Sequence, residues 1–152
     1  MSKPRVLFLC TGNSARSIMA EALLRHYAPN SFEVYSAGLE PKGINPYTIR
    51  AMDEIGLDVS GGRSTDVMDY LGKVHMGYVI TVCSNAEERC PIFPFGTQRL
   101  HWPFEDPAAF EGADADKLAK FREVRDQIEA RLRAWLVELK IQPAAAPLTS
   151  QA

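Results

Sequence analysis

The chain has 152 residues, a length typical of one domain, and its 46% hydrophobic and 24% charged residues are ordinary for a globular protein. The net charge of −2 gives no reason to expect binding to nucleic acid or to a membrane surface. No apolar run reaches the roughly 18 residues of a membrane span, and residues 6–10 are too few for the apolar part of a signal peptide. We therefore expect one cytoplasmic domain.

Apolar runs typical of strands alternate with segments of helical spacing. The expected strands are 6–10, 32–37, 77–83 and 98–102, and the expected helices are 17–27, 46–56, 66–71 and 114–140. This alternation predicts an α/β fold, a four-stranded parallel sheet with helices on both faces, within residues 1–140. Residues 141–152 are rich in proline and alanine, and we expect them to form a frayed tail.

A short polar loop joins the first expected strand to the first helix. Cys10 ends the strand, and Arg16 and Ser17 begin the helix. The loop amides and the helix N-terminus favour negative charge, and Arg16 adds a planar fork of donors, so the segment predicts a cradle for a tetrahedral oxyanion. Its members are Thr11, Gly12, Asn13, Ser14, Ala15, Arg16 and Ser17.

The same electrostatic field favours the thiolate form of Cys10, which we interpret as a nucleophile. Ser17 is placed either to donate a hydrogen bond to this sulfur or to cap the helix. We expect the Asn13 side chain to hold the loop in shape. The alternative is an inert buried cysteine, but the strand end, glycine, arginine and helix start then coincide for no reason.

The other two cysteines are Cys83 and Cys90. Three cysteines without paired ligands argue against both a secreted disulfide scaffold and a structural zinc site. Cys10 and Cys83 both lie at the carboxyl ends of expected strands, where parallel sheets bind their ligands. If those two strands are neighbours, the two thiols share one edge of the sheet.

The spacing Cys10-(five residues)-Arg16-Ser17 resembles the loop of low-molecular-weight protein tyrosine phosphatases. It also resembles that of the thioredoxin-coupled arsenate reductases that share their fold. The resemblance covers residues 3–140 and implies the strand order 2-1-3-4, which makes Cys10 and Cys83 neighbours. It also implies that Asp106, in the pair Asp106-Pro107, is the general acid that protonates the leaving group. On residue type alone, Asp106 would be a turn residue.

The segment from Cys83 to Cys90-Pro91 favours the reductases, because a phosphatase needs one thiol whereas reduction of arsenate takes two electrons. The resemblance implies a relay in which Cys10 attacks arsenate, a Cys10–Cys83 disulfide releases arsenite, and a Cys83–Cys90 disulfide passes to thioredoxin. If residues 84–90 are helical, the two cysteines lie about 10 Å apart along the axis. A disulfide needs Cα atoms within about 7 Å, so we expect this helix to unwind on oxidation.

Two residues depart from the pattern of these families. Ala15 stands where members often carry another cysteine, and Ala108 follows Asp106-Pro107 where the phosphatases often have tyrosine. The alternatives are a low-molecular-weight tyrosine phosphatase and, in another class, a non-enzymatic thiol redox sensor. The sensor would need neither Arg16 nor Asp106.

No cofactor is required by the expected chemistry. Some of these reductases hold a potassium ion, and its ligands here would be oxygens of Asn13, Ser36 and Asp66. The expected partners are arsenate, with phosphate or sulfate as mimics, and thioredoxin, and we expect the chain to act as a monomer.

Overall fold

The computed structural model describes residues 3–94 and 96–148. Its elements follow in the order β1 (Arg5–Cys10), α1 (Arg16–Tyr27), β2 (Glu33–Gly38), α2 (Pro46–Asp53), the 3₁₀ turn η1 (Val67–Asp69), β3 (Tyr78–Thr81), α3 (Ser84–Glu88), β4 (Gln98–His101), the 3₁₀ turn η2 (Pro107–Ala109) and α4 (Asp114–Glu138).

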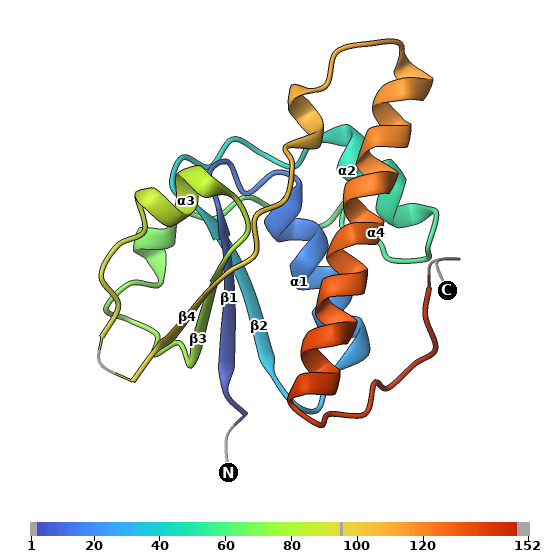
Figure 1. Cartoon of the computed structure of the whole chain (residues 1–152). Helices are drawn as coiled ribbons and strands as arrows, with labels where there is room; N and C mark the ends of the chain where they lie inside the picture. The colour runs from blue at the N-terminus through green and yellow to red at the C-terminus, as the bar shows by residue number, and fades with distance from the viewer. Residues whose placement is uncertain (1–2, 95, 149–152) are drawn as a thin grey trace.

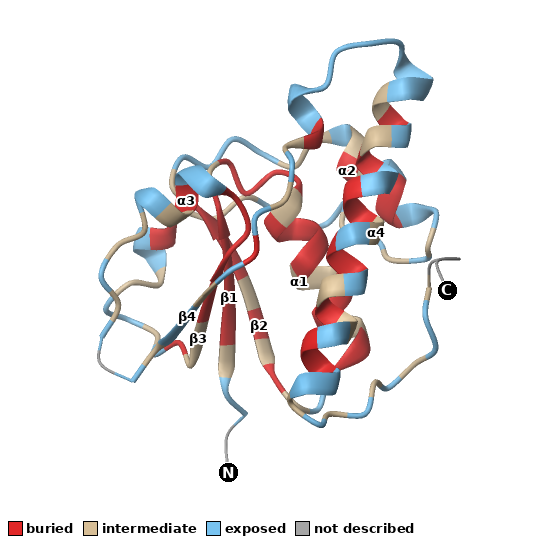
Figure 2. Cartoon of the chain, in the orientation of Figure 1, coloured by how far each residue is buried: buried red, intermediate tan, exposed pale blue. Residues whose placement is uncertain are grey.

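The four strands form one parallel sheet in the order β2-β1-β3-β4 (Figure 1). This confirms the predicted fold class and strand order. The central strand β1 is buried on both faces, and residues 6–9 have no exposed surface, as their continuous apolar run predicts (Figure 2). In the register, Cys10 lies opposite Gly38 of β2, and Leu9 lies opposite Thr81 of β3.

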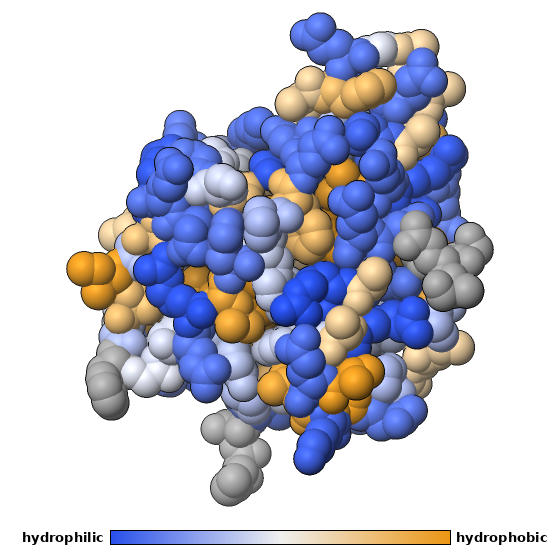
Figure 3. Space-filling view, in the orientation of Figure 1, coloured by the Kyte–Doolittle hydropathy of each residue, from blue (hydrophilic) through white to orange (hydrophobic). Residues whose placement is uncertain are grey.

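Helices α1 and α4 lie side by side along one face of the sheet, with α3 and η1 on the opposite side (Figure 1). The apolar face of α4 is buried against α1 and the sheet through Leu132, Trp135 and their neighbours. The Trp135 ring stacks on Phe32 with the ring centroids 5.3 Å apart. Figure 3 shows that the outer surface in this view is mostly hydrophilic, with small separate apolar patches.

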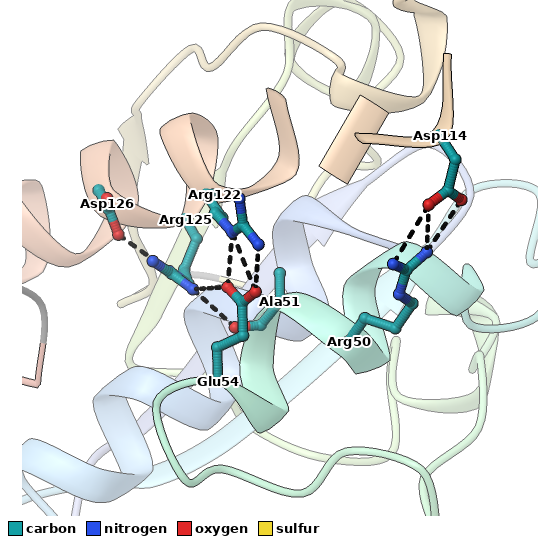
Figure 4. Close-up of polar contacts among 7 residues, drawn as sticks. All are labelled: Arg50, Ala51, Glu54, Asp114, Arg122, Arg125 and Asp126. Carbon is teal, nitrogen blue, oxygen red and sulfur yellow. Dashed lines mark hydrogen bonds and ion pairs between the residues drawn. The ribbon is translucent and has the colours of Figure 1, made fainter. Parts of the chain in front are cut away.

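Ion pairs fasten α2 to α4 (Figure 4). Glu54 accepts from Arg122 at 2.6 Å and from Arg125 at 3.0 Å, and Arg125 also donates to the backbone oxygen of Ala51. The hydrogen bonds from Arg122, with those from Arg125, hold the pKa of Glu54 below its usual value. These ion pairs also bear on the polar loop after β1, because Thr48 of α2 donates a hydrogen bond to the Ser14 carbonyl of that loop.

Several boundaries differ from the expectations. Strand β3 ends at Thr81, so Cys83 follows the strand instead of ending it. Helix α2 ends at Asp53, earlier than expected, and the expected helix at 66–71 is the shorter turn η1. Helix α3 ends at Glu88, which leaves Cys90 beyond the helix.

The segment from 141 to 148 differs from the expected frayed tail. The Ala144 amide donates to the Tyr27 carbonyl at 2.8 Å, and the Leu148 amide donates to the Tyr27 hydroxyl at 2.8 Å. Ile141, Ala145 and Leu148 pack against the core, so apolar contacts accompany these hydrogen bonds. Residues 149–152 of the expected tail lie outside the described residues. Among the residues described, no helix is both long and apolar enough to cross a membrane.

Candidate active site

The Cys10 sulfur lies at the end of β1, where hydrogen-bond donors converge on it. The Asn13 amide donates to Sγ at 3.2 Å, and the Ser17 hydroxyl lies 2.9 Å from Sγ. Ser17 Oγ already accepts from Asn13 Nδ2 at 2.7 Å, which leaves its own proton to point at the sulfur. Both groups are placed to donate a hydrogen bond to the sulfur, and helix α1 begins at Arg16 with its N-terminus at the same loop.

The backbone of the loop is held in an unusual shape. Asn13 has a φ of 47°, and its side-chain oxygen accepts from the Thr65 amide at 2.8 Å. The Ser64 hydroxyl donates to the Asn13 carbonyl at 2.5 Å. Asn13 therefore holds the loop in shape, as predicted, by linking it to residues 64–65.

Two further residues of the loop's support were not found from the sequence. A Cβ atom on Gly38 would lie 2.7 Å from the Thr11 carbonyl oxygen and 2.9 Å from the Asn13 amide nitrogen, so only glycine fits beside the loop. On the other side, the Thr48 hydroxyl of α2 donates to the Ser14 carbonyl at 2.8 Å. Pairing β1 with β2 in register places Gly38 opposite Cys10, and this pairing is the signal that could have identified Gly38.

A cleft of about 390 Å³ opens above the loop. It is lined by Cys10, Thr11, Gly12, Ser14, Ala15, Arg16, Lys42, Cys83, Ser84, Asn85, Phe104 and Asp106. The structure thus brings four of the five predicted catalytic residues to one cavity. Cys90 is the exception.

Arg16 and Asp106 meet on one wall of this cleft. Arg16 Nη1 donates to the Phe104 carbonyl at 3.0 Å, and Nη2 lies 3.9 Å from Asp106 Oδ2. Asp106 Oδ1 accepts from the Ala108 amide and so begins η2. This turn role is the one that its residue type favours, and it leaves Oδ2 facing the guanidinium. An arginine fixed at its carbonyl contact can present its remaining donors to an oxyanion.

Cys83 is buried and occupies the N-cap position of α3, where its sulfur accepts from the Ala86 amide at 3.3 Å. The Thr11 hydroxyl lies 3.5 Å from the same sulfur. Thr11 accepts from Asn85 Nδ2 at 2.8 Å, so its proton is available to Cys83. The oxyanion loop and the second thiol are therefore in direct contact.

Cys90 is half-buried and follows the end of α3, outside the cleft lining. Its sulfur lies 3.5 Å from the Pro91 carbonyl oxygen. Burial raises the pKa of this thiol, while Arg99 lowers it and Glu87 raises it further. All three cysteines are free in this structure.

The three side chains predicted to ligate potassium each have a structural role. Ser36 donates to Glu21 at 2.7 Å, Asp66 Oδ1 accepts from the Met68 amide at 2.9 Å, and the Asn13 oxygen accepts from Thr65. Within residues 3–94 and 96–148, no group of three or more His, Cys, Asp or Glu side chains is arranged to hold a metal. The potassium ion stays a prediction.

The model of the family described as low molecular weight phosphotyrosine protein phosphatase matches residues 5–145. The chain belongs to this family. An arsenate reductase from Shouchella clausii is 44% identical over 136 residues, which are 89% of this chain and 96% of that protein.

Two solved structures with the same fold are also arsenate reductases. An arsenate reductase in the phosphate binding state has a TM-score of 0.71 at 29% identity, over 89% of this chain and 98% of that one. A thioredoxin-dependent arsenate reductase from Corynebacterium glutamicum has a TM-score of 0.67 at 31% identity, over 91% of this chain and 62% of that one. The similarity of this phosphatase-family chain to reductases thus extends over nearly its whole length.

Proposed function

We propose that this chain reduces arsenate to arsenite with the thiols of Cys10, Cys83 and Cys90, and that thioredoxin restores the reduced protein. The contact of Cys83 with the oxyanion loop carries the proposal, because a phosphatase needs only Cys10 there. The names of the relatives support the same reaction.

The first step is displacement at arsenic. Arsenate occupies the loop, held by the backbone amides and Arg16, and the Cys10 thiolate attacks the arsenic atom. A sulfur–arsenic bond forms as an arsenic–oxygen bond breaks. Asp106, across from Arg16, gives the departing oxygen a proton, so that it leaves as water.

The second step transfers two electrons. The Cys83 thiolate attacks the Cys10 sulfur, and the pair of the sulfur–arsenic bond stays on arsenic, which leaves as arsenite. Cys90 then attacks Cys83, which forms the Cys83–Cys90 disulfide and releases the Cys10 thiolate. Helix α3 (Ser84–Glu88) stands between these two cysteines, and its five residues alone rise about 7.5 Å, more than the roughly 7 Å that a disulfide allows between two Cα atoms, so we expect it to unwind for the bond to form.

The experiment is arsenate-dependent consumption of NADPH with thioredoxin and thioredoxin reductase. We expect many turnovers for the wild type and at most one for Cys90→Ser. Loss of the rate in Asp106→Ala separates the enzyme from a thiol sensor, which would not need this carboxyl. The proposal is wrong if no arsenate-dependent consumption occurs while an aryl phosphate is hydrolysed rapidly by both wild type and Cys90→Ser.

Three finer points belong to the same proposal. Three free thiols suit the reducing cytoplasm, where we place the chain as a monomer. Potassium would be held by hard oxygens of Asn13, Ser36 and Asp66, with the Glu21 carboxylate next to Ser36. Comparing turnover in potassium and sodium chloride at equal ionic strength tests the ion.

A further inference from the structure

Lys42 stands at the rim of the oxyanion cleft, on the loop between β2 and α2. Its backbone amide donates to the Gly12 carbonyl at 3.1 Å. A Cβ atom on Gly12 would lie only 2.7 Å from Lys42 Cε, so the lysine stem lies directly over the loop. The ammonium is one bond beyond Cε, and the absent side chain of Gly12 leaves the room that the stem occupies.

The charge of Lys42 is not neutralised within the part of the chain that the structure describes, where no ion pair or hydrogen bond of its ammonium occurs. Glu40, the acidic residue nearest to it in sequence, is paired instead with Arg89 at 2.7 Å. The other charged side chains of the cleft lining are Arg16 and Asp106, which face each other. Lys42 is therefore the one cation in this lining without a carboxylate beside it.

A free cation in this position meets a specific need of the reaction. An anionic thiolate must approach an oxyanion that is itself negatively charged, and the two repel each other. Arg16 and the N-terminus of α1 offset part of that repulsion. A second cation at the entrance raises the local concentration of the oxyanion before it reaches the loop.

We propose that Lys42 is a substrate-binding residue that captures the incoming tetrahedral oxyanion and sets its affinity. The proposal rests on the proposed function for the identity of the oxyanion but not for its charge. Lys42 takes no part in the sulfur chemistry, so its effect falls on KM and on the sensitivity to salt, and much less on kcat.

The test compares Lys42→Gln and Lys42→Arg with Lys73→Gln, which removes an exposed lysine outside the cleft lining. We expect Lys42→Gln to raise KM for arsenate about tenfold, the low end of electrostatic focusing because one charge among several is removed. Lys42→Arg should restore most of the affinity, and Lys73→Gln should behave as the wild type. The fall of kcat/KM with rising salt should be shallower in Lys42→Gln.

Binding of inorganic phosphate to the reduced protein, measured by calorimetry, gives a second readout that needs no turnover. Weaker phosphate binding in Lys42→Gln supports the proposal, even if no variant reduces arsenate, in which case only the proposed function fails. Unchanged phosphate affinity, or a loss of kcat at constant KM, overturns it.

Discussion

Replacing Ser17 with alanine tests how the Cys10 thiolate is stabilised. The Ser17 hydroxyl lies 2.9 Å from Sγ and accepts from Asn13 Nδ2 at 2.7 Å, and both Ser17 and Asn13 are fully buried. The substitution therefore removes one donor to the sulfur and leaves one amide hydrogen of Asn13 without an acceptor.

The magnitude follows from these two losses. A hydrogen bond to a charged group contributes about 1.5–3 kcal/mol, which corresponds to roughly 10- to 150-fold in the rate of a reaction that this contact to the Cys10 sulfur assists. The unpaired amide costs a further 1–3 kcal/mol or so of folding stability. We expect the alkylation of Cys10 by iodoacetamide near neutral pH, and the first turnover of arsenate, to slow together.

The assay counts labelled Cys10 by peptide mass spectrometry, because three thiols compete for the reagent. Ser84→Ala is the matched control, since Ser84 lines the same cleft but makes no hydrogen bond to Cys10. Urea unfolding separates the stability loss from the reactivity loss. An alkylation rate within about twofold of the wild type in folded Ser17→Ala would refute the role given to this hydroxyl.

Three more predictions follow from individual contacts. Gly38→Ala should displace the loop, because its Cβ would collide with backbone atoms of Thr11 and Asn13, and calorimetry should show phosphate binding weakened at least tenfold, or about 1.4 kcal/mol. The step that forms the Cys83–Cys90 disulfide should still be accelerating at pH 9, because burial raises the pKa of Cys90 above its ordinary value of 9.0, and a rate in quench-flow that levels off below pH 9 would contradict this. Burial, aided by Glu129, raises the pKa of Tyr27 from 10.0 to about 12. This contribution to stability is complete below pH 10 and lost as the pH rises towards 12, so urea midpoints should fall more steeply there for the wild type than for Tyr27→Phe.

The parallel sheet and the oxyanion loop could be predicted because local patterns specify them. A continuous apolar run of five residues is typical of a central parallel strand that is buried on both faces, and the structure places β1 there. The coincidence of a strand end, a glycine and a helix start within Cys10–Ser17 indicated the candidate site without any long-range information, and part of this segment lines the cleft. Asn13 could be assigned to the loop because its side chain bonds locally and it tolerates a positive φ.

The residues that sequence reasoning missed act across long separations. Gly38 is needed because its backbone passes against the loop, and Thr65 because its amide reaches Asn13. Neither contact leaves a periodic trace in the sequence. Residues 141–148 differ from the expected tail for the same reason, since a proline- and alanine-rich composition does not reveal that Tyr27 offers two acceptors to their backbone.

The burial of the three thiols fits the order in which the proposed relay uses them. Cys10 and Cys83 are each 3% exposed and adjoin one cleft, whereas Cys90 is only half-buried and lies outside it. A reaction that forms an arsenic–sulfur bond gains from excluding water, because a dry site strengthens each interaction with the oxyanion. A disulfide that a second protein must reduce has to reach the surface. Helix α3 lies between these two environments, so its unwinding would carry oxidising equivalents outward and would release the contact between Asn85 and Thr11 of the oxyanion loop.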